Sequence, residues 1–121
     1  MTEKTRYSDD ELHEFDQLID VKLEKAHEEL NYYFAQIKEL ADNGSTKLKN
    51  LDDGTGTFES SRLQQMAARQ KKHIQHLNNA KLRIANKVYG VCRETGKLIS
   101  KERLKAVPHA TLSIVAKQKK N

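Results

Sequence analysis

Apolar residues recur every three or four positions along two long segments of the chain. The first set comprises Leu12, Phe15, Ile19, Leu23, Ala26, Leu30, Tyr33, Ile37 and Leu40. The second set comprises Leu63, Ala67, Gln70, Ile74, Leu77, Lys81, Ile84 and Val88, in which Gln70 and Lys81 interrupt the apolar stripe. Such spacing puts each set on one face of an α-helix. The pattern predicts a mostly α protein built on a long antiparallel helical hairpin of the coiled-coil type.

Short polar motifs predict where these helices begin and end. Ser8 to Glu11 and Ser61 to Gln64 both have the sequence of a capping box, in which the first and fourth residues satisfy each other's backbone N–H groups. Asn43-Gly44 is a plausible stop, because both residues tolerate the left-handed conformation that ends helices. Residues 43–60 are therefore predicted to form a tip loop, although the helix could also resume over Ser45 to Leu51.

The two predicted helices carry opposite charges. Residues 9–42 hold eleven acidic and three basic side chains, whereas residues 62–88 hold seven basic and no acidic ones. The two helices would therefore attract each other when packed antiparallel. Each exposed ion pair contributes only about 0–1 kcal/mol, so the apolar stripes must supply the stability while charge selects the pairing.

The pattern changes after Val88, which divides the chain into a hairpin of residues 1–88 and a small module of residues 89–121. Short strands are predicted over residues 88–91 and 97–99, around a turn in which Gly96 supplies the permissive conformation. Pro108 precedes a predicted final helix of about His109 to Lys117, followed by a basic tail that frays.

The module contains a single cysteine at a position suited to a zinc ligand. A four-cysteine site needs two C-x2-C pairs, but here the partners of Cys92 would be Thr95, Ser113 and Ala116. Adding His109 still leaves two ligands missing, so no zinc is expected. A core is predicted in its place from Leu98, Ile99, Leu104, Val107, Leu112, Ile114 and Val115. Cys92 itself could be a residual ligand, a redox sensor or a small buried hydrophobe.

Composition narrows the class of protein. The 121 residues are 36% hydrophobic and 32% charged, with no apolar run long enough to span a bilayer and no signal-peptide core at the N-terminus. A cytoplasmic location is expected. The chain shows no nucleophile elbow, phosphate-cradling glycine loop or paired acid and base, so it is not expected to be an enzyme. His73 and His76 are three residues apart but lack a carboxylate partner for a metal.

The C-terminal module closely resembles that of the DksA/TraR family, bacterial proteins in which a helical hairpin precedes a four-cysteine zinc finger. The matching positions are Tyr89, Gly90, Cys92, Gly96, Ile99, Arg103, Leu104, Ala106, Pro108, Ala110, Leu112, Ile114 and Lys117. In residues 8–88 the resemblance lies in hairpin organisation more than in identities. Three of the four family cysteines are lost.

The resemblance implies a transcription regulator whose hairpin enters the secondary channel of bacterial RNA polymerase and brings acidic tip residues near the active centre. Asp52 and Asp53 are the candidate tip acids. Asp52 falls on the second acid of the family's D-x-x-D-x-A motif, whereas Lys49 replaces the first acid and Gly54 replaces the alanine. The usual tip chemistry is therefore altered.

The resemblance also implies a site for the alarmone ppGpp, in which basic groups converge on a multiply charged anion. Arg69 and Lys117 fall on two of its positions, and His76 replaces a lysine at a third. Since histidine is shorter and mostly neutral at pH 7, this site would be weaker or altered.

An alternative function remains open. With a net charge of +5, the chain could be a basic adaptor that binds nucleic acid or the ribosome. Direct DNA binding is not expected, because part of the basic charge faces the acidic first helix.

Overall fold

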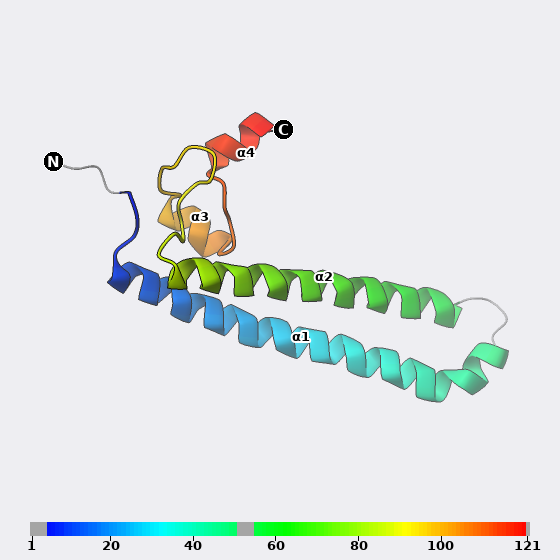
Figure 1. Cartoon of the computed structure of the whole chain (residues 1–121). Coiled ribbons are helices and arrows are strands. Elements are labelled where there is room, and N and C mark those ends of the chain that lie inside the picture. Colours follow the sequence, from blue (N-terminus) through cyan, green and yellow to red (C-terminus); the bar gives the residue numbers. More distant parts are fainter. Residues whose placement is uncertain (1–4, 51–54, 121) are drawn as a thin grey trace. The chain divides into compact units, whose positions relative to one another are not determined.

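The computed structural model describes residues 5–50 and 55–120, with side chains for residues 5–42 and 58–119. Four helices follow one another along the chain: α1 (Asp9–Asn50), α2 (Thr55–Ala85), α3 (Lys101–Ala106) and α4 (Ile114–Lys120). They are labelled in Figure 1. The described residues contain no extended sheet, only an isolated antiparallel bridge between Val91 and Leu98. The predicted mostly α fold is confirmed.

The chain divides into two compact units. Unit 1 comprises Met1–Leu23 and His76–Asn121, so the base of the hairpin packs together with the C-terminal module. Unit 2 comprises Glu24–Gln75. Within each unit the segments of α1 and α2 lie side by side and run antiparallel (Figure 1).

The predicted start of α1 is confirmed. The Glu11 N–H donates to Ser8 Oγ at 3.2 Å, and the Ser8 N–H donates to Glu11 Oε1 at 2.9 Å, which completes the capping box. Asp9, Asp10 and Glu11 in the first turn also complement the positive end of the helix dipole.

The predicted tip loop of residues 43–60 is too long. Helix α1 continues past Asn43-Gly44 to Asn50, and α2 begins at Thr55 instead of at the capping box of Ser61. A glycine inside a helix costs only about 1 kcal/mol, so it does not end the helix where the following residues are compatible with helix. The alternative of a helix resuming after Gly44 was the better one.

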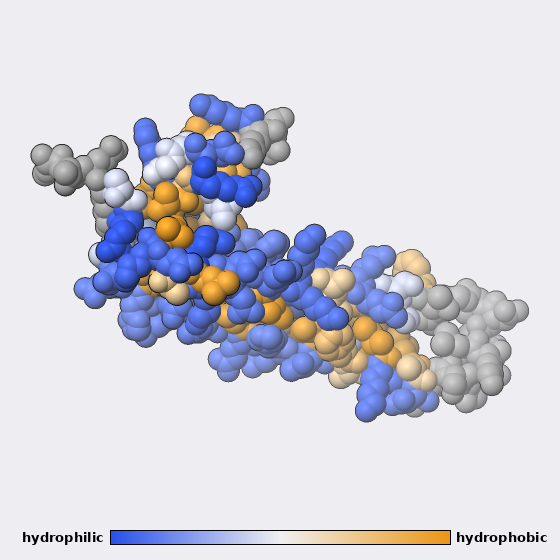
Figure 2. All heavy atoms as spheres, in the orientation of Figure 1, coloured by the Kyte–Doolittle hydropathy of each residue, from blue (hydrophilic) through white to orange (hydrophobic). Residues whose placement is uncertain are grey.

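The residues of the two stripes, apart from Val88, are buried or half-buried as predicted. Unit 2 buries Ala26, Leu63, Ala67 and Ile74, and it half-buries the remaining apolar stripe positions of α1 from Leu30 to Leu40. In Figure 2 the apolar side chains follow the line between the helices and are flanked by hydrophilic ones. Val88 is an exception at 50% exposed, because α2 ends before it.

The end of α2 has a Schellman geometry. The Val88 N–H donates to the Arg83 carbonyl at 2.9 Å and the Lys87 N–H to the Ile84 carbonyl at 3.0 Å. Lys87 takes the left-handed position with φ of 63°, which glycine usually occupies. The chain therefore turns sharply from α2 into the module.

An aromatic cluster forms the centre of unit 1. The Phe15 ring lies 5.7 Å from that of Tyr7 and 5.3 Å from that of Tyr89, measured between centroids. The Tyr7 hydroxyl donates to the Ile99 carbonyl, and the Tyr89 hydroxyl donates to the Pro108 carbonyl at 2.8 Å. Edge-to-face contacts add about 0.5–1.5 kcal/mol per pair to the burial of the rings. The N-terminal segment, α1 and the module thus share one core.

The module core differs in part from the prediction. Ile99 and Leu104 are fully buried, and Leu98, Val107 and Leu112 are half-buried against the same core. Ile114 and Val115 were wrongly assigned to it: they are 52% and 61% exposed. The reason is that α4 begins at Ile114 instead of at about His109 and turns Ala116 inward, so the two preceding side chains face outward. Helix α4 also extends through Lys120, where the tail was expected to fray.

The predicted strands are replaced by a tight turn. Cys92 N–H donates to the Lys97 carbonyl at 2.8 Å, and Ile99 N–H donates to the Gly90 carbonyl at 2.7 Å. These bonds close the loop without forming a ladder of more than one bridge. The segment therefore turns as predicted but is too short for regular strands.

Gly90 and Gly96 offer a matched pair of substitutions. Both have positive φ, 78° and 71°, but a Cβ on Gly90 would lie 2.6 Å from Tyr7 Cε2, whereas a Cβ on Gly96 would meet nothing within 4 Å. We expect Gly96→Ala to cost about 1 kcal/mol of unfolding free energy from backbone strain alone. Gly90→Ala should cost about 3 kcal/mol, because the aromatic cluster must also move. Chemical denaturation measures both, and equal losses would show that the Tyr7 ring yields freely.

Candidate functional site

The candidate tip acids Asp52 and Asp53 lie outside the described residues. In the sequence they stand between the last residue of α1, Asn50, and the first residue of α2, Thr55. Their role in the tip therefore stays a prediction.

The three candidate ppGpp residues are described in different units. His76 and Lys117 belong to unit 1, whereas Arg69 belongs to unit 2 and is exposed on α2. The His76 ring stacks on that of His109, with centroids 5.3 Å apart and an interplanar angle of 10°. The His76 ring thus packs against the His109 ring. A lysine at position 76 would place a charged amino group there instead. Lys117 is exposed on α4.

Arg83 lies in the last turn of α2 and was not predicted as a site residue. Its Nη2 donates to the His109 carbonyl at 3.2 Å. Burial lowers the pKa of Arg83, and the nearby Arg93 charge acts in the same direction, although the guanidinium remains cationic at neutral pH. This half-buried cation ties α2 to the segment that carries His109. Sequence reasoning missed Arg83 because no motif distinguishes it from the other basic residues of α2.

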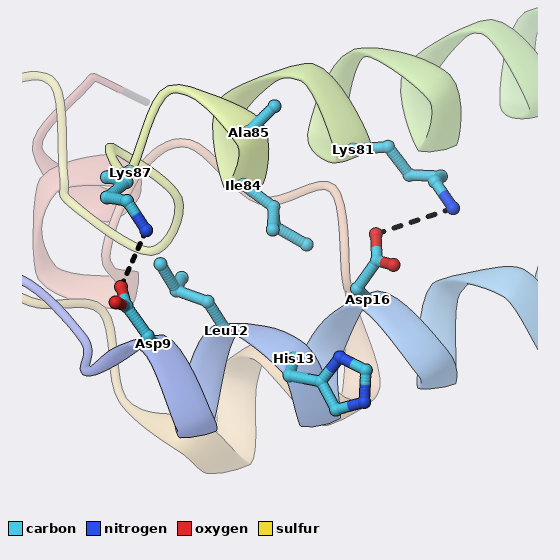
Figure 3. Close-up of a pocket in the computed structure, with 8 residues that line it drawn as sticks. All are labelled: Asp9, Leu12, His13, Asp16, Lys81, Ile84, Ala85 and Lys87. Carbon is cyan, nitrogen blue, oxygen red and sulfur yellow. Dashed lines mark hydrogen bonds and ion pairs between the residues drawn. The ribbon is translucent and has the colours of Figure 1, made fainter.

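A cleft of about 370 Å³ opens between α1 and α2 in unit 1. Leu12, Ile84 and Ala85 supply apolar lining, with Asp9, His13, Asp16, Lys81 and Lys87 around them (Figure 3). The charged groups are already matched: Lys87 Nζ lies 2.7 Å from Asp9 Oδ1, and Lys81 Nζ lies 3.4 Å from Asp16 Oδ1. Since each cation faces a carboxylate, the cleft offers no concentration of one charge for a cofactor.

These ion pairs confirm the predicted attraction between the two helices. Lys81 also contacts Asp20, and the Asp20 hydrogen bond is the main cause that raises the pKa of Lys81. In unit 2, Gln70 Nε2 donates to Glu29 Oε2 at 2.7 Å and to the Ala26 carbonyl at 3.4 Å. The two polar residues in the α2 stripe are therefore used to bond α1. This leaves less uncompensated positive charge on α2 for nucleic acid.

Cys92, Thr95, Ser113 and Ala116 stand at the four positions of the family zinc site. Cys92 is buried, and its Sγ accepts from the Ser113 N–H at 3.4 Å. Burial raises the pKa of the Cys92 thiol, but hydrogen bonds from the Thr95 hydroxyl and from backbone N–H groups outweigh it and lower the pKa to about 6. Ala116 offers no donor atom, and Thr95 and Ser113 offer neutral hydroxyls. The set does not fit zinc, which needs four ligands with deprotonated thiolates or imidazoles.

The described residues also lack other groups of metal ligands and membrane-spanning helices. Within residues 5–50 and 55–120, no group of three or more histidine, cysteine, aspartate or glutamate side chains could hold an ion. Over the described helices, none combines the length and apolar character that a membrane span requires.

Comparison with known proteins gives a consistent picture. The family model for the prokaryotic DksA/TraR C4-type zinc finger matches residues 87–121. The solved structure of transcription factor DksA2 from Pseudomonas aeruginosa has a TM-score of 0.75 and 25% identity, over 90% of this chain and 81% of that one. No curated protein matches.

The fold defines a class of proteins with a long helical hairpin and a zinc-finger-like C-terminal module. Residues 87–121 match the zinc-finger module of the DksA/TraR family and keep one of its four cysteines, and the chain as a whole resembles the transcription factor DksA2. The resemblance inferred from residues 89–117 is thereby confirmed.

The pairing of Asp9 with Lys87 predicts a pH dependence. A hydrogen bond from Lys87, with another from Arg6, lowers the pKa of Asp9 from its ordinary 3.8. A carboxyl whose pKa is lower in the folded state stabilises the fold above its unfolded pKa, and this contribution is lost as the pH falls through the folded pKa. We expect Asp9→Asn to reduce the acid sensitivity of the unfolding free energy below pH 4, measured by denaturation at several pH values. Asp10→Asn, one residue along, is the control. It removes a charge that shares the helix-dipole interaction, and it should change the profile less than Asp9→Asn does.

Proposed function

We propose that the chain is a transcription regulator that binds bacterial RNA polymerase through its secondary channel and brings Asp52 and Asp53 near the active centre. The match of residues 87–121 to the DksA/TraR zinc-finger model and the likeness of the chain to a transcription factor support a role in transcription. The observation that carries the finer proposal is the continuation of α1 to Asn50 and the start of α2 at Thr55. The two acids therefore belong, in sequence, to the short connection between the helices.

The exposed side chains of unit 2 support a protein partner over nucleic acid. Tyr32 and Phe58 are 60% and 71% exposed, and Phe34 is 42% exposed with Lys71 Nζ 5.1 Å from its ring centroid. Aromatic residues, arginine and methionine are enriched in protein interfaces. Arg62, which bonds Glu59 and Met66, lies in the same unit. A hairpin that docks through such groups needs no excess of positive charge.

The tip acids supply the direct test. In the double variant Asp52→Asn and Asp53→Asn, polymerase binding should stay within about twofold while the effect on initiation is abolished, because the acids act on the active centre and not on docking. Binding is measured with purified polymerase, and initiation by multiple-round transcription. The control Glu39→Gln with Asp42→Asn removes the same charge from α1 and should keep activity. Unchanged transcription from the tip variant would remove Asp52 and Asp53 from the mechanism.

We further propose that Arg69, His76 and Lys117 bind ppGpp when the regulator acts with it. Lysine is longer than histidine and carries a permanent charge at neutral pH, so His76→Lys should raise ppGpp affinity by roughly tenfold, which corresponds to about 1.4 kcal/mol. Gln75→Lys adds the same charge one position away and should not. Equilibrium binding of ppGpp to the polymerase complex measures both. Equal gains in the two variants would indicate general charge attraction without a site at position 76.

A further inference from the structure

The family zinc positions stay close together in this chain although three of them have lost their sulfur. Cys92 and Ala116 are 1% and 4% exposed and belong to the same buried cluster. Ser113 lies between them: its backbone N–H donates to Cys92 Sγ at 3.4 Å, and its Oγ accepts from the Ala116 N–H at 3.2 Å. The two halves of the former ligand set therefore contact each other directly.

Hydrogen bonds to backbone carbonyls hold this arrangement from both sides. The Gly96 N–H donates to the Cys92 carbonyl at 2.8 Å and closes the turn that carries Thr95. The Arg93 N–H donates to the Thr111 carbonyl at 3.0 Å, and Arg103 Nε donates to the Leu112 carbonyl at 2.9 Å. The two segments that would each supply a pair of ligands are thus fastened to one another next to Cys92 and Ser113.

The hydroxyl of Ser113 completes the contact. Cys92 Sγ lies 3.8 Å from Ser113 Oγ, within the longer range of a bond that involves sulfur. The same Oγ accepts from Ala116 N–H in the first turn of α4, so one side chain connects the cysteine turn with that helix. A metal ion would make this connection through four ligand bonds in a tetrahedral site.

We propose that the hydrogen-bonded contact between Cys92 and Ser113, here called the clasp, replaces the zinc ion of the family. The backbone still holds the four ligand positions close together. Cysteines at the other three positions would therefore restore a zinc site. The clasp fastens the cysteine turn to α4, and the apolar core around Ile99 and Leu104 supplies the rest of the stability. The proposal concerns how the module is held together and is independent of polymerase binding.

The first test uses the unaltered full-length protein. We expect elemental analysis to find well under 0.1 zinc per chain and the melting temperature to be the same with and without a chelator such as EDTA. One zinc per chain, or melting at a lower temperature in EDTA, would overturn the proposal.

The clasp itself is tested by paired substitutions. Cys92→Ser keeps a small group that can bond Ser113, whereas Cys92→Ala removes it. The loss of a buried acceptor should lower the melting temperature of Cys92→Ala by roughly 5 °C or more, and Cys92→Ser should fall by less. Ser113→Ala should resemble Cys92→Ala. Melting of both alanine variants at the temperature of the unaltered chain would show that the clasp does not hold the module.

The retained geometry is tested by adding ligands. The variant with Thr95→Cys, Ser113→Cys and Ala116→Cys should bind one Co²⁺ with the absorption bands of a tetrahedral thiolate site, and zinc should displace it and raise the melting temperature. Adding Cys92→Ser to this variant leaves three thiolates and should weaken Co²⁺ binding at least tenfold. A folded triple variant that binds no Co²⁺ would contradict the retained positions. If the triple variant does not fold even with zinc, that result contradicts them as well, since metal binding should drive folding of a preserved site.

Discussion

The aromatic contact of Phe15 with Tyr7 and Tyr89 is the interaction on which unit 1 depends. It brings together the N-terminal segment, the start of α1 and the chain that follows α2, and each tyrosine hydroxyl then bonds a carbonyl of the module. Gly90 is required at the same place, because the Tyr7 ring occupies the space that any side chain there would need. The module needs this apolar support, since a chain of this size with a divided core has few other sources of stability.

Periodicity predicted the two long helices and most of their buried faces. The stripe from Leu12 to Leu40 works because a long amphipathic helix has many positions that agree with one another. Boundaries were predicted less well: the capping box at Ser8 forms, whereas the similar sequence at Ser61 lies inside α2. Capping signals are local, and a helix passes through one when the residues before it also favour helix.

The module could be predicted from residue identities more than from physical pattern. Ile99 and Leu104 are buried as expected, but the exposure of Ile114 and Val115 depends on the start of α4. Ser113 caps this helix through the Ala116 N–H, without the paired Glu or Gln that makes a capping box easy to find in the sequence. The packing of Tyr7 and the hydrogen bond of Arg83 to the His109 carbonyl join residues far apart in sequence. Such contacts become visible only once the chain is folded. The assignment of Asp52 and Asp53 as tip acids rests on sequence spacing alone and stays a prediction.

The polar residues of the α2 stripe have a consequence for alignment. An apolar stripe alone allows one helix to slide along its neighbour by a turn at little cost, because many registers bury similar surface. Gln70 and Lys81 restrict this freedom, because each meets its partners in one register only. Gln70 bonds Glu29, and Lys81 bonds Asp16 and Asp20. Each unit thus contains one polar residue of α2 that fixes the register of α2 against α1.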